Sequence, residues 1–562
     1  MNYKEKYQSW LDFDGMDEQS RAQLLEIQND DNEIKERFFT DLEFGTAGLR
    51  GIIGAGTARM NIYTVRRATQ GLALYLLQNG GGSVAIAYDS RHFSREFAME
   101  SAAVLSANGI TAYVFDSLRP TPELSFALRH LGCSAGIVIT ASHNPAQYNG
   151  YKVYGADGGQ LSGEASNAVE KLINSLSIFE DVKTDANAEL IKIIGAEVDE
   201  AYYKSTLSNI IDKSLIEKCR DMKIVFTPFH GAGNIPVREV LKRAGFENVI
   251  VVPEQEKPDG AFPTVKSPNP ENPEGFALAV ALADKEGADL IIGTDPDSDR
   301  VGVMARNKKG EFVALTGNQT GALLTEYMLS ALKKQGRLPK NGAIIKTIVT
   351  TEMVREITEA YGVELVNVLT GFKYIANKIA LYEQTGDNTF ILGFEESYGY
   401  LVGTDVRDKD AVVASLMIAE MAAGYALCGM SLYDGLCALF EKYGTYKEYN
   451  INIYMEGLDG AQKISAVMSN LRENLPTSFG GAQVVSYTDY SSGESTDVQS
   501  GAKTKVDLPA SNVLQFVLSD KTLVTWRPSG TEPKLKVYLC ACGNDADEKI
   551  EKIKKDVELL IK

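Results

Sequence analysis

Histidine and cysteine are scarce in this chain. It holds four histidines and six cysteines in 562 residues. No two histidines stand at metal-ligand spacing and no CxxC pair occurs, so a zinc ribbon and an HExxH metalloprotease are excluded. A disulfide scaffold is not expected at this length, and buried reduced thiols are the favoured interpretation.

Nucleotide-binding and membrane signatures are missing as well. No GxxxxGK[ST] and no GxGxxG occurs, so we expect no site for ATP or NAD. The longest apolar stretches fall short of about 18 residues, and the charged N-terminus lacks a signal-peptide core, which predicts a cytoplasmic protein without a membrane span. The 75 acidic residues exceed the 57 Lys and Arg residues, giving a net charge of −18. That balance argues against nucleic acids and anionic membranes as partners.

The length predicts several domains, because single hydrophobic cores stop growing near roughly 250–300 residues. Short, nearly continuous apolar runs alternate with helix-like segments, which is typical of doubly wound α/β domains. The predicted strands are 84–88, 137–140, 224–227, 249–252, 290–293, 344–349 and 390–393. The predicted helices between them include 97–108, 236–244, 276–286, 318–333 and 351–360.

The two ends of the chain differ from this alternation. The first fifty residues predict a helical extension, with aromatic and apolar residues at helical spacing that indicate packing. The last part predicts an α+β domain with an antiparallel sheet. Its predicted strands are 449–454, 513–518, 522–526 and 536–541, and a helix over 546–561 follows. The Ser-, Thr-, Asp- and Gly-rich segment 487–507 is interpreted as a surface excursion.

A serine loop, Thr-Ala-Ser-His-Asn-Pro over 140–145, follows a predicted strand. Ligands of α/β domains bind beyond the carboxyl ends of strands, so Ser142 could act as a nucleophile, with Lys152 near enough to hold an anion. The alternative is a turn that caps the next element. A hydrolase triad is not expected, because the GxSxG elbow is absent and His143 adjoins the serine.

An acidic loop, Asp-Pro-Asp-Ser-Asp-Arg, follows another predicted strand. In an extended chain Asp295, Asp297 and Asp299 would point to one side, roughly 6–7 Å apart, and a gentle turn would converge them on a cation. An EF-hand is excluded because Arg300 and Arg306 occupy the sixth and twelfth loop positions, where Gly and Glu belong. Oxygen ligands beside an arginine favour Mg²⁺ shared with a substrate phosphate. The alternative is a solvated acidic turn.

Three other segments carry groups suited to a phosphosugar. Phe-Glu-Glu-Ser offers Glu395 and Ser397 to sugar hydroxyls, although a strand-end turn is a competing interpretation. Lys409 follows within a charge cluster of the kind that is usually a solvated face. The segment 527–531, Arg-Pro-Ser-Gly-Thr, is either a phosphate cradle or an ordinary turn. The predicted loop 45–50 consists mostly of small residues and ends in one arginine, Arg50.

Taken in this order, the five motifs resemble the α-D-phosphohexomutase superfamily over essentially the whole chain. The motifs that carry the resemblance are GTAGLR at 45–50, TASHNP at 140–145, DPDSDR at 295–300, FEES at 394–397 and RPSGT at 527–531. The chain is most similar to the phosphoglucomutase/phosphopentomutase branch. The reasons are its length, its helical N-terminal extension, TPFHGAG at 227–233, and DPDSDR where other branches carry DGDGDR.

The resemblance implies roles for individual residues. Ser142 would be the phosphoserine that gives and receives the phosphoryl group. Mg²⁺ would be held with it by Asp295, Asp297 and Asp299. Sugar hydroxyls would be bound by Glu395 and Ser397. The non-reacting phosphate would be bound by Arg527, Ser529, Gly530 and Thr531. Further residues at matching positions around the site are Arg50, Lys152, Arg300, Thr370, Gly371 and Lys409.

Two positions depart from the family pattern. Lys536 stands where the family usually has an arginine, which keeps the charge but loses the bidentate fork. Tyr398 follows Ser397, where some branches place a histidine. The second departure leaves Lys409 and His143 as the candidates for the general acid/base.

The resemblance also implies four domains around a central cleft. Residues 1–204, 205–320 and 321–447 would form three doubly wound α/β domains, and residues 448–562 an α+β domain. The expected reaction interconverts glucose 1-phosphate and glucose 6-phosphate through glucose 1,6-bisphosphate, so the partners would be small sugar phosphates. Phosphopentomutase or phosphomannomutase activity, a metal-dependent phosphatase and a non-catalytic sugar-phosphate-binding relative remain as alternatives.

Overall fold

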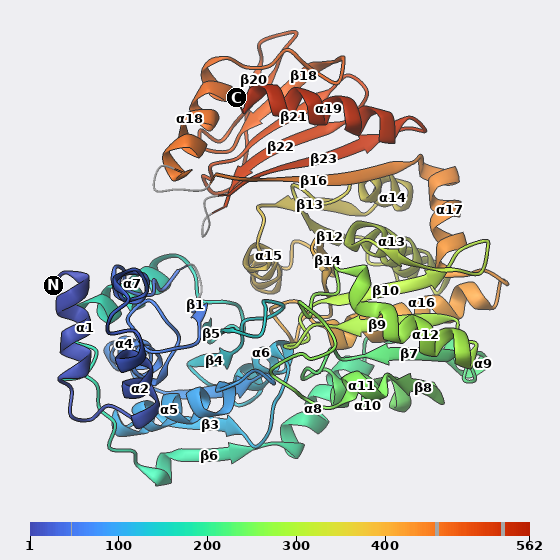
Figure 1. The fold of residues 1–562 in the computed structure, drawn as a ribbon. Coiled ribbons are helices and arrows are strands. Elements are labelled where there is room, and N and C mark those ends of the chain that lie inside the picture. Colours follow the sequence, from blue (N-terminus) through green and yellow to red (C-terminus); the bar gives the residue numbers. More distant parts are fainter. Residues whose placement is uncertain (46–47, 456–459, 530–533, 562) are drawn as a thin grey trace. The chain divides into compact units, whose positions relative to one another are not determined.

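The computed structural model describes residues 1–45, 48–455, 460–529 and 534–561, and Figure 1 shows their elements. The chain forms two compact units. The first contains residues 1–315, 376–386 and 398–431, and the second contains residues 316–375, 387–397 and 432–562. Within the described ranges, no helix is both long enough and apolar enough to cross a bilayer.

The first unit begins with three short helices, as the N-terminal pattern predicts. They are α1 (Tyr3–Leu11), α2 (Glu18–Glu26) and α3 (Asp31–Phe38). Buried apolar side chains of all three helices pack together with Tyr63. The Trp10 ring meets the rings of Phe38 and Tyr63 edge-on, at centroid distances of 5.6 Å and 5.4 Å. This helical extension is therefore a packing element.

A six-stranded sheet follows, in the order β1-β5-β4-β2-β3-β6. Its strands are β1 (Gly48–Ile52), β2 (Ser83–Tyr88), β3 (Thr111–Phe115), β4 (Ala135–Ile139), β5 (Tyr148–Gly155) and β6 (Ile191–Ile194). Its helices are α4 (Ile62–Gln78), α5 (Ser94–Ala107), α6 (Thr121–His130) and α7 (Gly163–Ser175). Alternate residues of β4 face opposite sides: Ile137 joins the core under α4, α5 and α7, whereas Gly136 lies against α6. Helices therefore cover both faces.

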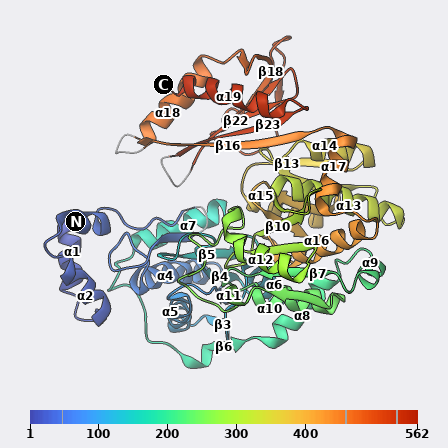
Figure 2. The same cartoon turned by 45° about the vertical axis from the view of Figure 1, so that its right-hand side comes forward.

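The second sheet has the order β11-β10-β9-β7-β8. Its strands are β7 (Lys223–Thr227), β8 (Asn248–Val251), β9 (Leu290–Thr294), β10 (Val301–Arg306) and β11 (Phe312–Leu315). The remaining helices of the first unit are α8 (Ala196–Leu207), α9 (Lys213–Lys218), α10 (Asn234–Ala244), α11 (Pro253–Glu256), α12 (Ala277–Glu286) and α16 (Ala411–Ala426). Two 3-10 turns, η1 (Ala188–Leu190) and η2 (Pro273–Phe276), and the strand β15 (Gly399–Val402) complete it. Figure 2 shows these elements in a second orientation.

The second unit holds a parallel sheet in the order β13-β12-β14. Its elements are β12 (Gly342–Thr347), β13 (Glu364–Val368), β14 (Thr389–Glu395), α13 (Gly317–Lys334), α14 (Met353–Tyr361) and α17 (Leu432–Tyr443). Helix α15 (Phe372–Thr385) is divided between the two units. The strands that the sequence predicts in these three sheets are confirmed, although their ends differ from the predicted ends by a few residues.

The last part of the second unit is an antiparallel sheet with two helices; the sequence predicts the sheet and the C-terminal helix, but not the first helix. Its strands are β16 (Tyr446–Tyr454), β17 (Ser478–Phe479), β18 (Ala482–Asp489), β19 (Glu494–Asp497), β20 (Lys503–Lys505), β21 (Leu514–Leu518), β22 (Leu523–Pro528) and β23 (Lys534–Cys542). The helices are α18 (Gly460–Glu473) and α19 (Ala546–Leu560). The predicted excursion 487–507 forms the hairpin β19–β20, which extends the sheet from β18.

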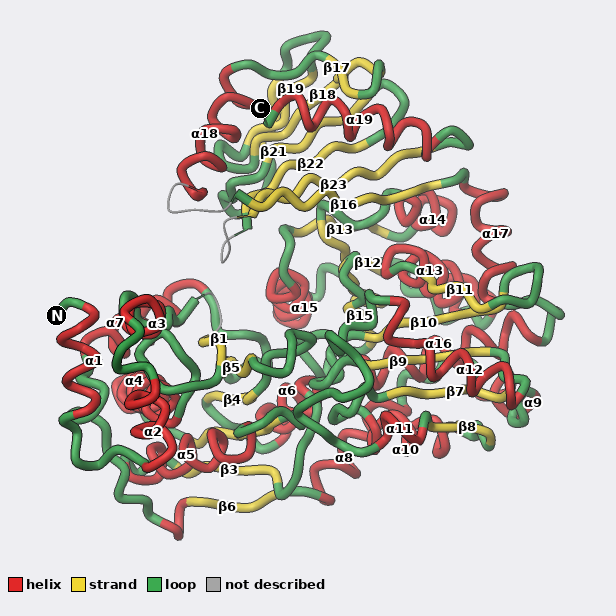
Figure 3. Tube along the Cα trace, in the orientation of Figure 1, coloured by secondary structure: helices red, strands yellow, loops and turns green. Residues whose placement is uncertain are grey.

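The first two sheets each have a parallel centre and an antiparallel edge, which the strand–helix alternation did not predict. β5 returns antiparallel to β4 after residues 140–147, and β10 returns antiparallel to β9 after residues 295–300. Both connections are too short for the crossover that a parallel strand requires, so each chain reversal makes a hairpin. The serine loop and the acidic loop are the tips of these hairpins, drawn in green in Figure 3.

Candidate active site

The serine loop holds Ser142 in a constrained conformation. Ser142 follows β4, is 4% exposed, and has a φ of +52°, a left-handed conformation that is unfavourable for residues other than glycine. Its N–H donates to Thr140 Oγ1 at 2.8 Å, which closes the turn. Its hydroxyl donates to Asp295 Oδ2 at 2.8 Å and lies 3.1 Å from His143 Nδ1. The structure therefore joins the serine loop to the acidic loop through the predicted nucleophile.

A buried ion pair after β2 supports this loop. The Arg91 guanidinium donates to the carbonyl oxygens of Ser142, at 2.6 Å, and of Pro145 and Tyr148, each at 2.9 Å. Asp89 accepts from Thr140 Oγ1 at 2.6 Å and lies 3.3 Å from Arg91 Nε. Both side chains are fully buried, and burial raises the pKa of Asp89. Sequence reasoning missed this pair. The available signal was an Asp-Ser-Arg triplet directly after a predicted strand.

The acidic loop is a tight turn and not the gently curved extended segment that the sequence suggested. Ser298 has a φ of +52°, and the backbone N–H groups of Asp299 and Arg300 both donate to Asp295 Oδ1, at 3.1 Å and 3.0 Å. One carboxylate oxygen from each of Asp295, Asp297 and Asp299 lies within 4.8 Å of the others. All three side chains are buried, so the solvated alternative is wrong.

Two lysines face these carboxylates. Lys152 Nζ lies 2.9 Å from Asp297 Oδ2 and 3.7 Å from Asp299 Oδ2. Lys409 Nζ lies 3.1 Å from Asp299 Oδ2. Burial opposes the ionisation of Asp299, but the charges of Lys409, Lys152 and Arg300 outweigh it and lower its pKa. Burial and the neighbouring carboxylates raise the pKa of Asp295 well above its usual range.

The acidic cluster has the donor set of a metal site. Within the described part of the chain, Asp297 Oδ1 and Asp299 Oδ1 are buried and have no hydrogen-bond partner. Buried carboxylate oxygens without donors are costly, and a divalent cation would satisfy them. Oxygen-only ligands suit hard cations such as Mg²⁺, Mn²⁺ and Ca²⁺. The aspartate triad can therefore bind a metal ion.

Cations and a neutral imidazole surround the nucleophile. β1 pairs with β5 so that Gly48 faces Lys152, which places Arg50, two residues on, beside the serine loop. Arg50 donates to Asn144 Oδ1 at 3.4 Å. Arg300 pairs with Glu271. Burial and the charges of Arg300 and Arg50 lower the pKa of His143 well below its usual range, so its ring is uncharged at neutral pH.

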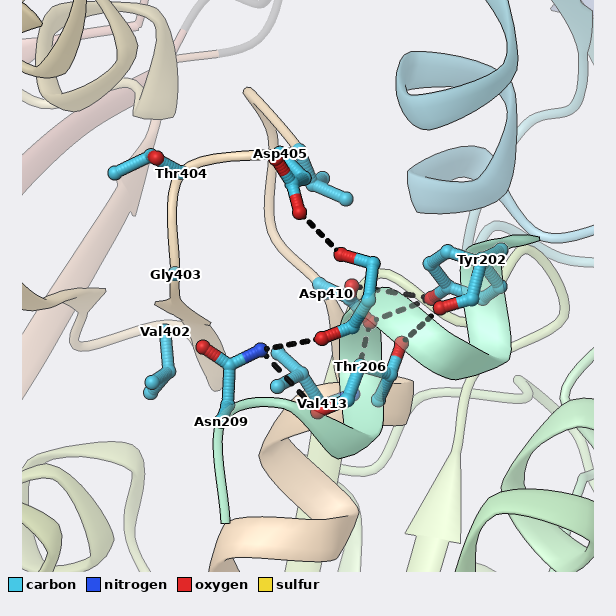
Figure 4. Close-up of a pocket in the computed structure, with 11 residues that line it drawn as sticks. Tyr202, Thr206, Asn209, Val402, Gly403, Thr404, Asp405, Asp410 and Val413 are labelled. Carbon is cyan, nitrogen blue, oxygen red and sulfur yellow. Dashed lines mark hydrogen bonds between the residues drawn. The ribbon is translucent and has the colours of Figure 1, made fainter. Parts of the chain in front are cut away.

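The charge cluster around Lys409 is buried, contrary to the expected solvated face. Each of Arg407, Asp408, Lys409 and Asp410 is at most 9% exposed. Asp410 caps α16 by accepting from the backbone N–H groups of Val412 and Val413. It also accepts from the Tyr202 hydroxyl at 2.9 Å, as Figure 4 shows around a narrow pocket. The hydroxyl of Tyr202 on α8 therefore helps to fix the segment that carries Lys409.

The predicted sugar-binding residues lie in the second unit. Glu395 ends β14, is 6% exposed, and accepts from the Gly371 N–H at 2.9 Å. This contact arises because β13 and β14 flank β12 in parallel, so their carboxyl ends share one edge of the sheet. Gly371 has a φ of +123°, which favours glycine. Thr370 and Ser397 adjoin these two residues in sequence.

Three of the predicted phosphate-binding residues, Arg527, Ser529 and Lys536, lie in or directly after the paired strands β22 and β23. Arg527 is paired directly with Lys536 across the two strands, and its guanidinium donates to the Tyr538 hydroxyl at 3.2 Å. The Ser529 N–H donates to Lys534 O at 2.7 Å. Gly530 and Thr531 lie outside the described residues. The structure therefore brings Arg527 and Lys536 onto one surface, as a shared phosphate contact would require.

Comparison with known proteins yields matches along most of the chain. Three family descriptions match in order: phosphoglucomutase/phosphomannomutase, alpha/beta/alpha domain I at residues 41–178, domain II at residues 200–310 and domain III at residues 316–443. A protein named phosphoglucomutase from Staphylococcus aureus (strain MRSA252) is 40% identical over 531 residues, covering 94% of both chains. Its namesake from Staphylococcus haemolyticus is 39% identical over 506 residues, covering 90% of this chain and 91% of its own.

The fold also matches solved structures. A phosphoglucomutase/phosphomannomutase family protein from Burkholderia thailandensis superposes with a TM-score of 0.67 at 19% identity, covering 92% of this chain and 97% of its own. At that identity the likeness bears on the fold alone. It agrees with three α/β domains followed by a C-terminal sheet domain.

Proposed function

The chain belongs to the phosphoglucomutase/phosphomannomutase family, and we propose that it interconverts glucose 1-phosphate and glucose 6-phosphate through a phosphorylated Ser142. It is an isomerase of the phosphoglucomutase type, the name that its staphylococcal relatives carry. The observation that carries the residue assignment is the 2.8 Å hydrogen bond from Ser142 Oγ to Asp295 within the aspartate cluster. A nucleophile beside a cation site is the arrangement that phosphoryl transfer needs.

The first step transfers the phosphoryl group from Ser142 to the free hydroxyl of a sugar monophosphate. The bond from phosphorus to Ser142 Oγ breaks, a bond to the sugar oxygen forms, and the hydroxyl proton passes to a base. The sugar bisphosphate then reorients, and its other phosphate returns to Ser142 with the reverse proton transfer. Glucose 1,6-bisphosphate is thus both the intermediate and the compound that primes the enzyme.

Positioning and electrostatics supply most of the acceleration in such a transfer. Asp295, Asp297 and Asp299, with the phosphoryl group on Ser142, would hold Mg²⁺, which offsets negative charge on the phosphoryl oxygens. Lys152 and Lys409 add fixed positive charge beside the same carboxylates. The support for this set is its convergence from three loops and strand β5 of the first unit.

Proton transfer has two candidates. The uncharged His143 ring lies within hydrogen-bond reach of Ser142 Oγ, and a neutral imidazole accepts a proton. Lys409 is the other candidate, and its Nζ lies 3.1 Å from Asp299 Oδ2 and 3.2 Å from Asp408 Oδ1. Comparing the pH dependence of kcat for His143→Gln and Lys409→Met separates them, because only loss of the true base removes the acidic limb.

Recognition of the substrate falls to residues of the second unit in this proposal. Glu395, Ser397, Thr370 and Gly371 bind sugar hydroxyls. Arg527, Ser529, Gly530, Thr531 and Lys536 bind the phosphate that is not transferred. Arg50 and Arg300 contact the transferred phosphoryl group. The support is the chemistry of the side chains, since carboxylates and hydroxyls suit sugar hydroxyls, and the Arg527–Lys536 pair suits a phosphate.

The test is a coupled mutase assay with and without glucose 1,6-bisphosphate, on glucose, mannose and ribose 1-phosphates. We expect bisphosphate-dependent turnover with the highest kcat/KM for glucose 1-phosphate. Intact-mass measurement should show a phosphate-sized increment that Ser142→Ala abolishes together with activity. A hundredfold preference for the pentose would reassign the substrate, and activity surviving in Ser142→Ala would overturn the mechanism.

A further inference from the structure

The backbone of the acidic loop is held at three successive carbonyl groups, those of residues 296–298. They accept, in order, from the N–H groups of Ala232 at 2.8 Å, Thr121 at 2.8 Å and Ala411 at 3.1 Å. The donors come from the loop after β7, the first residue of α6 and the first residue of α16. Anchors from three separate segments leave the loop little freedom to shift.

Thr121 makes a second contact that the other two anchors do not make. Its hydroxyl donates to Asp297 Oδ2 at 2.9 Å, and Lys152 Nζ donates to the same oxygen at 2.9 Å. Thr121 is fully buried, and so is Asp297. The other oxygen, Asp297 Oδ1, is one of the buried atoms that have no partner within the described residues. The two donors therefore occupy one carboxylate oxygen and leave the other for a ligand.

We propose that Thr121 is a positioning residue for the metal ion, because its hydroxyl fixes the orientation of the Asp297 carboxylate. This inference rests on the proposed function, in which the aspartate triad holds a divalent cation. Lys152 alone would orient the carboxylate poorly, since its ammonium is a point charge on a flexible stem and also faces Asp299 at 3.7 Å. Losing a hydrogen bond that orients a metal ligand typically costs about 10–100-fold in metal affinity.

Two substitutions distinguish the effect of the Thr121 hydroxyl from the effect of the side chain's shape. Thr121→Val keeps the branched shape and the N–H anchor but removes the hydroxyl. Thr121→Ser keeps the hydroxyl and removes one methyl group. We expect Thr121→Val to weaken divalent-cation binding by about tenfold or more, and Thr121→Ser to bind close to wild type. Thr121→Ala, which also lacks the hydroxyl, should behave like Thr121→Val. It takes the place of Thr121→Val in the experiment if the valine variant does not fold.

The experiment measures Mn²⁺ binding to the full chain by electron paramagnetic resonance, with Asp297→Asn as the control that locates the ion. Melting temperatures without metal report the purely structural cost of each variant. Weaker Mn²⁺ binding in Thr121→Val and Thr121→Ala, with Thr121→Ser near wild type, supports the inference.

Two results would overturn it. Thr121→Val binding Mn²⁺ as tightly as wild type would show that the hydroxyl does not orient Asp297. Equal losses in Thr121→Val and Thr121→Ser would make the effect one of packing. A wild-type chain that binds no Mn²⁺, or Asp297→Asn that binds it equally well, would instead refute the metal site of the proposed function, and the role of Thr121 with it.

Discussion

Replacing Arg91 with methionine is expected both to destabilise the protein and to slow the reaction. Arg91 is fully buried, and its guanidinium donates to four carbonyl groups of the segment 142–148 at 2.5–2.9 Å. Methionine is apolar and of similar length, so it preserves much of the packing while removing every donor. The carbonyl oxygens of the serine loop and the Asp89 carboxylate would then lose their buried partner.

The size of the effect follows from the burial of this pair. Breaking a buried ion pair by removing one partner costs about 3–5 kcal/mol, because the other charge stays desolvated. Removing both partners costs less than the sum, so the double variant Asp89→Asn/Arg91→Met should regain part of the loss. Since Ser142 sits at a left-handed φ that its neighbours must hold, a loop shift of about 1 Å should lower kcat roughly 10²-fold.

Urea unfolding and the coupled mutase assay test these two expectations on the same samples. Arg91→Lys is the matched control, because it keeps the positive charge but loses the planar fork, and it should fall between wild type and methionine. The reasoning would be refuted if Arg91→Met stayed within about 1 kcal/mol of wild type with unchanged kcat, which is the behaviour of an uninvolved position.

Three further expectations follow from the site. Gly231→Ala should weaken Mn²⁺ binding by about tenfold, because an added Cβ would lie 2.4 Å from the Cα of Pro296, the residue between Asp295 and Asp297. Gly71→Ala is the control, because its added Cβ would lie equally close to Ile173, far from the aspartates in sequence. It should lower the melting temperature without changing the affinity for Mn²⁺. Chelation with EDTA should abolish activity, and added Mg²⁺ should restore it; full activity after exhaustive chelation would contradict the metal site. Burial raises the pKa of Asp410 from 3.8 to about 6, so this residue contributes stability below about pH 4 that is lost as the pH rises through 6. Asp410→Asn should therefore gain about 3 kcal/mol relative to wild type between pH 4 and pH 7, and calorimetric scans with a constant difference across that range would refute the assignment.

The fold was largely predictable from local pattern. Continuous apolar runs bounded by polar turns located the central strands β2, β4, β7, β9 and β12, because a strand covered on both faces needs apolar residues throughout. The same pattern did not reveal that β5 and β10 run antiparallel. Strand direction depends on the length of the connection and on where the next strand finds unpaired backbone groups, and neither is encoded in one strand's composition.

The candidate residues for the reaction could also be selected from the sequence by their type. Ser142 and the three aspartates stand out because they follow predicted strands, and the carboxyl ends of strands are where α/β domains bind ligands. The supporting residues were not. Asp89, Arg91 and Thr121 belong to ordinary-looking turns, and their contacts join residues separated by 51 to 176 positions along the chain.

The sequence by itself determined which chemical groups the candidate site offers, namely a serine, an acidic triad and several basic residues, since residue type and position after a strand are local properties. Only the tertiary structure decided how that chemistry is held. Three distant segments fix the acidic loop, a buried arginine fixes the serine loop, and the Arg407–Asp410 charges that look solvated in sequence are buried. Burial and distance depend on how remote segments pack, so no local pattern specifies them.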